Sequence, residues 1–276
     1  MDPKVTIEEK YLIVDGIRTH LRMGGAGYPL VLVHGLGGPS MWQRVIEPLS
    51  KQFHAIVIDL PGFGESDCAP KEFSTDEYAD FLYHTIEALG IEKAAIAGIS
   101  YGGQIAATFA ARYADRLEKL ILIASTGFVK LRFLFRSRRL WDMFSTVVKH
   151  TILHSQLLIC LFGRFSFYNV GSRPSDLCEE FYRQLSQDGK REAWLNAIKS
   201  IYAGQKHFSS TLTSLRCSTL IIWGEDDKTV PAKFASEFQQ RIPHSRLRTF
   251  AACAHSVPLE KPTELCEALF SFIASS

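Results

Sequence analysis

The sequence predicts an α/β protein built on a doubly wound, mostly parallel sheet that carries an inserted group of helices. Three observations lead to this prediction. Apolar runs that end at Gly, Pro or Asp alternate with helical patterns, an order typical of parallel sheets. The runs are apolar at nearly every position, as in strands that are buried on both faces. One long segment between "LILIAS" and "STLIIWG" has no strand pattern, so we interpret it as a helical insertion.

The strands and helices follow in order along the chain. Two alternating stretches, "KYLIVDG" and "RTHLRMGG", predict a first hairpin. Buried strands are predicted in "YPLVLVHGLGG", "FHAIVIDLPGFGES", "KAAIAGIS", "LEKLILIAS" and "STLIIWGEDD", and a further strand is predicted in "RLRTFAACA". Helices are predicted in "STDEYADFLYHTIEALG", "GGQIAATFAARYADR", "PAKFASEFQQRI" and "EKPTELCEALFSFIASS". The first of these helices opens with a capping box from Ser74 to Glu77 and stops at Gly90.

The helical insertion between the strands "LILIAS" and "STLIIWG" divides the chain into two predicted domains. Residues 1–127 and 206–276 form the core domain, and residues 128–205 form a lid of short helices. In open α/β sheets ligands bind at the carboxyl ends of the strands, the edge that such an insertion would cover.

Composition narrows the class of protein. Of 276 residues, 46% are apolar and 22% are charged, which is ordinary for a globular chain. The six cysteines form no C-x-x-C pair, and His150 and His154 have no evident third ligand, so we predict mostly buried free thiols and no metal site. The polar start "MDPKVTIEEK" lacks the pattern of a secretory signal, and "TILHSQLLICLF" is too short to span a bilayer. We therefore expect a cytoplasmic protein without stable membrane insertion.

Three residues at predicted strand ends suit nucleophilic catalysis. Ser100 lies between the strand "KAAIAGIS" and a helix, in the strand–turn–helix context of a nucleophile elbow. Asp227 follows "STLIIWG", and His255 follows "RLRTFAACA". Serine is a weak nucleophile until an imidazole takes its proton, and a carboxylate orients that imidazole.

Five stretches carry a family resemblance: "HGLGG", "DLPGFGES", "GISYGG", "WGEDDKTVP" and "AHSVPLEKP". With them the chain resembles the α/β-hydrolase superfamily, in its lidded serine esterase and lipase-like branch. The resemblance implies Ser100 as nucleophile, Asp227 and His255 as its triad partners, and no cofactor. It implies that the backbone N–H groups of Leu36 and Tyr101 form the oxyanion hole.

The same resemblance also assigns roles to two residues that lie close to the predicted site residues in sequence, Asp226 and His34. The family spacing W-G-x-x-D-x-x-x-P selects Asp227 over Asp226, which becomes a solvated loop or capping residue. His34 is implied to support its loop through hydrogen bonds and not to act as a base.

The predicted activity is that of a carboxylesterase, a serine hydrolase that cleaves carboxylic esters with an apolar acyl or alcohol part through an acyl-enzyme. The alternatives are a carbon–carbon bond hydrolase of aromatic ring-cleavage products, or a weakly catalytic ligand receptor on the same scaffold. The first alternative is disfavoured because such relatives usually have Trp after the triad His, where this chain has Ser256. Thioesters, lactones and amides also stay open as substrates.

The predicted lid has an unusual composition. Residues 128–168 hold seven of the 19 Phe, and seven basic residues against one acid give them a net charge of +6. We interpret this as an apolar lid floor with a solvated basic outer face, and place Phe133, Trp141 and Phe144 over the substrate. The alternative is an anionic partner, either a carboxylate-bearing substrate or weak contact with an acidic lipid surface. No nucleic-acid motif accompanies the charge, and the oligomeric state is not predicted.

Overall fold

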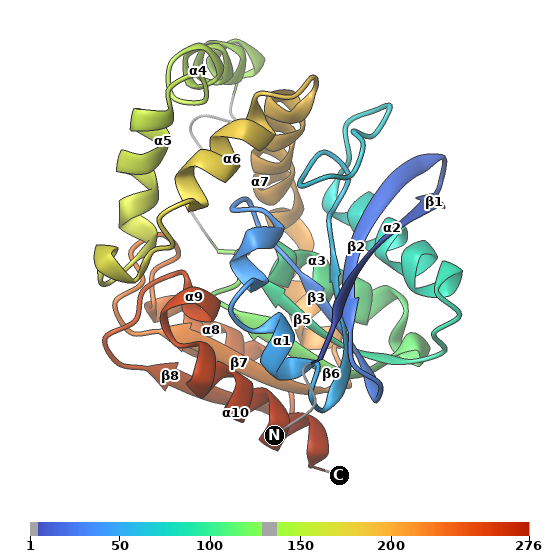
Figure 1. Ribbon diagram of the computed structural model, residues 1–276. Helices are drawn as coiled ribbons and strands as arrows, with labels where there is room; N and C mark the ends of the chain where they lie inside the picture. Colours follow the sequence, from blue (N-terminus) through green and yellow to red (C-terminus); the bar gives the residue numbers. More distant parts are fainter. Residues whose placement is uncertain (1–4, 129–136, 276) are drawn as a thin grey trace.

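The computed structural model describes residues 5–128 and 137–275, and it confirms the predicted fold class. One eight-stranded sheet runs in the order β1-β2-β4-β3-β5-β6-β7-β8 (Figure 1). The hairpin β1–β2 is antiparallel and β2 pairs antiparallel with β4, whereas every later pair is parallel. The strands are β1 (Ile7–Val14), β2 (Ile17–Gly24), β3 (Tyr28–Val33), β4 (Phe53–Ile58), β5 (Ala94–Ile99), β6 (Leu117–Ile123), β7 (Ser218–Gly224) and β8 (Ser245–Phe250).

Both faces of the central strands are buried, which explains their continuous apolar runs. In β3, Val31 and Val33 belong to one core cluster, whereas Leu30 and Leu32 belong to the other. Successive side chains of a strand point to opposite faces, so each face needs its own cover of helices.

Helices supply that cover on each side of the sheet. Side chains of α2, α3 and α8 join the first cluster, and side chains of α1 and α10 join the second. The predicted capping box is present, since Ser74 Oγ accepts the Glu77 N–H and the Glu77 carboxylate accepts the Ser74 N–H. The helices of the core are α1 (Ile46–Leu49), α2 (Thr75–Ala88), α3 (Tyr101–Arg112), α8 (Lys233–Arg241), α9 (Val257–Glu260) and α10 (Pro262–Ala274), with short 3-10 turns η1 (Pro39–Trp42) and η2 (Ala114–Arg116).

The insertion between β6 and β7 is helical in the part that the structure describes. It lies over one end of the sheet, yellow-green to gold in Figure 1. Its elements are α4 (Arg138–His150), α5 (Gln156–Gly163), η4 (Arg164–Ser166), η5 (Val170–Ser172), α6 (Leu177–Leu185) and α7 (Lys190–Ser214). Within the described ranges, no helix is both long and apolar enough to cross a bilayer.

The predicted domain boundary after residue 205 falls inside α7. At Gly204 the backbone of α7 packs closely against the core. A Cβ at Gly204 would lie 2.7 Å from Gln104 Nε2 and 3.0 Å from Thr75 Oγ1. Beyond it, Phe208 and Leu212 are buried in the core cluster. One helix therefore belongs to the lid at its start and to the core at its end.

A buried lysine fastens the start of α7 to the core. The Lys190 ammonium donates to the carbonyl oxygens of Ser66, Gly64 (3.3 Å) and Phe63 (3.5 Å). Burial lowers the pKa of this amine. A buried cation needs such partners, so these carbonyls fix where the lid helix meets the loop after β4.

All six cysteines are free, as predicted, but only three of them are buried. Cys178, Cys253 and Cys266 are buried, and burial raises the pKa of the Cys253 and Cys266 thiols to about 12. A thiol with so high a pKa is a poor nucleophile near neutral pH.

Candidate active site

Ser100 occupies a strained turn between β5 and α3. Its φ of 56° and ψ of −120° lie outside the regions that residues with a side chain usually adopt. The turn is tight because backbones meet at both flanking glycines. A Cβ at Gly98 would lie 2.2 Å from the Gly102 carbonyl oxygen, and a Cβ at Gly102 would lie 2.3 Å from that of Val33. The strain is thus held in place by packing, and the Ser100 side chain lines a pocket.

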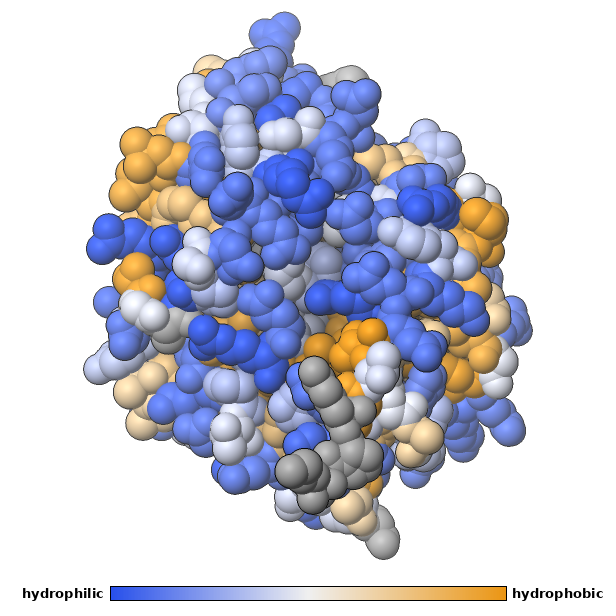
Figure 2. All heavy atoms as spheres, viewed as in Figure 1, coloured by the Kyte–Doolittle hydropathy of each residue, from blue (hydrophilic) through white to orange (hydrophobic). Residues whose placement is uncertain are grey.

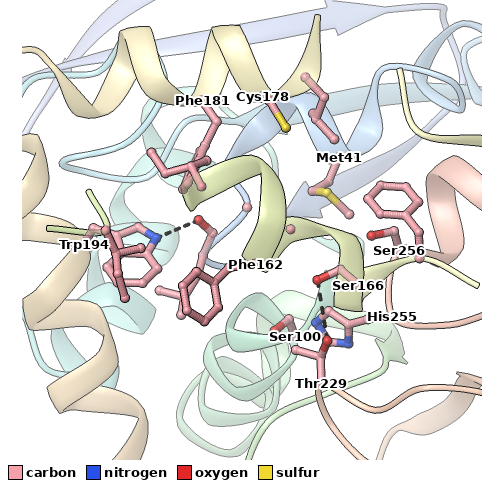
Figure 3. A pocket seen from close by; sticks show the side chains of 18 of the residues that line it. Met41, Ser100, Phe162, Ser166, Cys178, Phe181, Trp194, Thr229, His255 and Ser256 are labelled. Atoms are coloured by element: carbon pink, nitrogen blue, oxygen red, sulfur yellow. Dashed lines mark hydrogen bonds between the residues drawn. The ribbon is translucent and has the colours of Figure 1, made fainter. Parts of the chain in front are cut away.

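Asp227 and His255 are joined by a short hydrogen bond. The distance from His255 Nδ1 to Asp227 Oδ2 is 2.7 Å, and both side chains are buried. An ionised carboxylate only accepts, so Nδ1 carries the hydrogen and Nε2 keeps its lone pair. The other carboxylate oxygen, Oδ1, accepts the N–H groups of Thr229 (2.8 Å) and Val230 (2.9 Å). The imidazole lines the same pocket as Ser100 (Figure 3).

The structure places Asp227, and not the adjacent Asp226, next to His255, in agreement with the sequence interpretation. Asp226 is exposed, whereas Asp227 is buried and bonded to His255. The Trp223 indole N–H donates to the Val230 carbonyl at 3.0 Å and closes the loop that carries both aspartates.

The predicted oxyanion loop lies directly against the Ser100 turn. A Cβ at Gly35 would lie 2.7 Å from Ser100 Cβ and 3.1 Å from the Tyr101 nitrogen. Leu36 therefore comes from a segment that contacts the Ser100 turn, and it lines the pocket. The Trp194 indole N–H from α7 donates to the Leu36 carbonyl at 3.0 Å (Figure 3), so the lid helps to orient this peptide.

The Tyr101 side chain turns away from the pocket. Its hydroxyl donates to Ser200 Oγ at 2.8 Å, and the ring is buried. Of this residue, only the backbone N–H is a candidate for the oxyanion hole, as the sequence predicts.

His34 supports the oxyanion loop, as predicted. Its Nε2 accepts the Leu60 N–H at 3.1 Å, so its Nδ1 carries the hydrogen and donates to the Gly35 carbonyl at 2.7 Å. Complete burial lowers the pKa of the imidazole from 6.5 to about 4. A neutral ring therefore holds the loop at physiological pH.

This burial predicts a pH-dependent contribution to stability. Because the folded pKa is depressed, the contribution is complete above pH 6.5 and is lost as the pH falls toward the folded value of about 4. Relative to His34→Gln, which cannot titrate, we expect the native protein to lose about 2 to 3 kcal/mol of unfolding free energy between pH 7.5 and 4.5. Urea unfolding of both proteins at several pH values measures this difference. A gap between them that is independent of pH would contradict the assignment.

The pocket beside Ser100 is apolar and is formed by the core and the lid together. Its volume is about 480 Å³. The core contributes Leu36, Met41 from η1 and Ile99 at the end of β5, and the lid contributes a larger group of apolar side chains: Phe144, Val148, Ile152, Leu153, Ile159, Phe162, Phe167, Leu177, Phe181, Trp194 and Ile198. Figure 3 shows Met41, Phe162, Phe181 and Trp194 arranged around this space.

The three lid residues predicted to cover the substrate have different outcomes. Phe144 lines the pocket. Trp141 packs against the Phe144 ring with centroids 5.7 Å apart and is absent from the described lining, so it supports Phe144 from behind. Phe133 lies outside the described residues.

Sequence reasoning missed Arg173. Among the described lining residues it is the one Lys or Arg, and its Nη1 donates to the Cys160 carbonyl at 3.2 Å. It also missed Met41, Phe162 and Trp194. The basic composition of the lid gave a general signal for a carboxylate-bearing substrate, but no local motif marks any of these positions.

The lid also contacts the loop that carries His255. The Ser256 N–H donates to the Ser166 carbonyl at 2.9 Å. One oxygen of Glu260 accepts the Ala254 N–H at 2.9 Å, and the other accepts the Tyr168 N–H at 2.7 Å. The segment around η4 and the histidine loop therefore form one connected unit. Across the described parts of the chain, no group of three or more His, Cys, Asp or Glu residues could hold a metal ion.

Comparison with known proteins relates this arrangement to named hydrolases. The chain is 28% identical over 289 residues to the 2-hydroxymuconate semialdehyde hydrolase of Pseudomonas sp. (strain CF600), covering 96% of this chain and 93% of that protein. It is 25% identical over 285 residues to the 2-hydroxy-6-oxo-2,4-heptadienoate hydrolase of Pseudomonas putida F1, covering 96% of both. The solved structure of a meta-cleavage product hydrolase from Pseudomonas fluorescens IP01 superposes with a TM-score of 0.80 at 25% identity, covering 96% of this chain and 97% of that one.

These relatives overturn the expectation of a carboxylesterase. A 2-hydroxy-6-oxodienoate contains no ester bond, so its hydrolysis must break a carbon–carbon bond, which is the alternative that the sequence left open. The error has a physical reason. An activated serine and an oxyanion hole serve any acyl transfer, whichever atom leaves. The presence of Ser256 after the histidine is therefore weak evidence against carbon–carbon bond cleavage.

The family assignment covers most of the chain. The profile of the family described as alpha/beta hydrolase fold matches residues 28–262, from the start of β3 to the start of α10. That range contains the Ser100 turn, the Asp227 loop, the His255 loop and the described lid. The chain therefore belongs to the alpha/beta hydrolase fold family.

Proposed function

We propose that the protein hydrolyses a carbon–carbon bond in 2-hydroxy-6-oxodienoates that carry one carboxylate and an apolar group on C6. The observation that carries this proposal is the lining of the pocket. It combines Ser100 and His255 with a single guanidinium, Arg173, in otherwise apolar surroundings. The curated relatives named above support the substrate class.

Arg173 supplies the partner that a carboxylate needs in such a pocket. Burial of an unpaired carboxylate costs several kcal/mol, and a guanidinium can donate two parallel hydrogen bonds to its oxygens. The rest of the lining offers hydroxyl groups and apolar side chains, but no second Lys or Arg among its described members. The pocket therefore suits a ligand that has a carboxylate at one end and an apolar group at the other.

The bond that breaks lies between C5 and C6. A proton moves from the 2-hydroxyl to C5, which makes C6 a saturated ketone and leaves an unsaturated ketone at C2 through C4. Ser100 Oγ then adds to C6 while His255 Nε2 takes its proton, and the N–H groups of Leu36 and Tyr101 stabilise the oxyanion. The C5–C6 electron pair leaves into the conjugated system as a dienolate, which takes up the proton to give 2-hydroxypenta-2,4-dienoate.

Water completes the reaction. The acyl group of C6 is left on Ser100 as an ester, and His255 deprotonates the water that hydrolyses it. The sum is one substrate and one water giving a carboxylic acid and the dienoate. Buried Asp227 keeps His255 in the tautomer that both proton transfers require.

The role of Arg173 gives a specific prediction. Charge-assisted hydrogen bonds contribute about 1.5–3 kcal/mol, so Arg173→Leu is expected to lower kcat/KM by about 10- to 100-fold. Arg173→Lys is expected to retain part of the activity because it keeps the charge but loses the planar fork. Steady-state kinetics on the 6-phenyl substrate measures both effects.

The control is an analogue in which a primary amide replaces the C1 carboxylate. If Arg173 pairs with the carboxylate, native protein and Arg173→Leu differ little on this analogue. An equal loss on both compounds would mean that the substitution disturbs the lid through the Cys160 contact.

The whole proposal is tested with 2-hydroxy-6-oxo-6-phenylhexa-2,4-dienoate. We expect the dienol absorbance to disappear over many turnovers, with benzoate and the pentadienoate formed in equal amounts. A matching compound with a propionate on C6 is expected to react more slowly because its second carboxylate has no cation to meet. Tight binding without turnover would contradict the proposal and favour the ligand receptor.

A further inference from the structure

Apolar side chains gather on the outer surface of the lid. Of the eleven large apolar side chains that are exposed in the described residues, eight lie between residues 140 and 168. Five of them fall in α5 and the turn after it, and Figure 2 shows this apolar surface at the left, over α5. These five, here called the α5 face, are Leu157 (68% exposed), Leu161 (44%), Phe162 (54%), Phe165 (65%) and Tyr168 (55%).

The α5 face has the geometry of one continuous stripe. Leu157 and Leu161 are four residues apart on α5, the spacing that places side chains along one side of an α-helix, and Phe165 follows in the turn η4, which begins where α5 ends. Isolated exposed apolar residues are ordinary, but contiguous ones mark an interaction surface. The expected solvated basic exterior is thus incomplete, because this part of the lid exterior is apolar.

The stretch of chain that carries this face has charge of one sign, and the one carboxylate bonded to it, Glu260, accepts the N–H groups of Tyr168, Asn169 and Ala254. Residues 143–175 contain Lys149, Arg164 and Arg173 and no Asp or Glu. Lys149 pairs with Glu192, and Arg173 lines the pocket. Arg164 lies between Phe162 and Phe165 and is exposed, and its guanidinium has no side-chain partner in the part of the chain that the structure describes.

We infer that the α5 face docks on an anionic phospholipid surface, with its apolar side chains in the interface and Arg164 at the headgroups. Such a surface can bury the apolar side chains and can attract the Arg164 cation through its anionic headgroups. A second copy of the chain fits less well. A twofold contact through this face would set two segments against each other that each hold Arg164 and no Asp or Glu.

The face is continuous with the pocket. Phe162 is more than half exposed and also lines the cavity beside Ser100 (Figure 3). A docked lid would therefore bring the cavity wall close to the interface, where amphiphilic carboxylates with an apolar end concentrate.

The test is co-sedimentation of the full chain with vesicles. One set is phosphatidylcholine alone, and the other contains phosphatidylglycerol at three parts in ten. We expect binding to the anionic set, with a loss at 0.5 M NaCl because salt screens the headgroups. Arg164→Gln is expected to weaken partitioning about fivefold, and the double variant Leu161→Gln, Phe165→Gln at least about tenfold.

The matched control is Ile13→Gln, which removes an apolar side chain of 69% exposure from β1, outside the lid. It is expected to bind as the native protein does, and thermal melting shows whether each variant is folded. Equal binding to neutral vesicles, or unchanged binding of the double variant, would overturn the inference. A dimer in sedimentation equilibrium that the double variant dissociates would assign the face to a second copy instead.

Discussion

Replacing Ser100 with alanine is expected to lower kcat for cleavage of the 6-phenyl dienoate by about 10⁴- to 10⁶-fold. The hydroxyl oxygen is the atom that bonds to C6, and no other group of the strained turn can take its place. Binding is expected to persist because Arg173 and the apolar lining are untouched. Stopped-flow absorbance separates the two quantities, since the substrate can be seen to bind and then fail to disappear.

The control for this substitution is Ser145→Ala. Ser145 is a lid serine whose hydroxyl donates to the Asp142 carbonyl at 3.1 Å. It is expected to change kcat less than about twofold, as surface substitutions usually do little. Activity of Ser100→Ala within tenfold of the native protein would remove Ser100 from the chemistry and leave the reaction to an activated water.

Asp227→Asn is expected to reduce kcat by about 10⁴-fold. The amide can present its NH₂ group to His255 Nδ1, which then becomes the acceptor and leaves the hydrogen on Nε2. In that tautomer the imidazole cannot take the Ser100 proton. Two backbone N–H groups already bond to Oδ1, so the amide oxygen is drawn to that position and its NH₂ to the histidine.

The neighbouring residue provides a close control. Asp226→Asn makes the same chemical change one position away, on an exposed side chain. It is expected to stay within about twofold of native activity. Similar losses in both variants would mean that the net charge of the loop matters and not the bond to His255.

The elements and the residues around Ser100 could be predicted because their signals are local. The capping box at Ser74, the apolar runs, and the glycines beside Ser100 each act over a few residues. Asp227 and His255 follow strands, and parallel strands bring their carboxyl ends to one edge. Their meeting at 2.7 Å is a consequence of topology that a linear pattern can anticipate.

The lid could not be predicted in the same way. Which of its side chains face the pocket depends on how α4 to α7 pack, and that packing joins residues far apart in the chain. Arg173 and Trp194 illustrate the difficulty, since each reaches the site through a contact with no counterpart in nearby sequence. The extension of α7 past Gly204 likewise depends on partners in α2 and α3.

The reaction itself was predictable only to the level of acyl transfer. The same nucleophile, base and oxyanion donors serve an ester and a ketone, and the difference lies in the leaving group. We expect selectivity for one leaving group to depend on the pocket lining, which comes largely from the lid.

The contact between the lid and the histidine loop limits how new specificities can be built on this chain. Ser166 holds the N–H next to His255, and Glu260 bonds to both segments. A chimaera that imports a foreign lid across residues 164–169 would replace part of the scaffold around His255, the proposed general base. Grafts that end before Arg164 would exchange the part of the pocket wall that runs from Phe144 to Phe162 and leave the contacts of the His255 loop intact. The useful crossover point in this protein is therefore set by the hydrogen bonds between residues 166–169 and the His255 loop, and not by the end of the insertion in sequence.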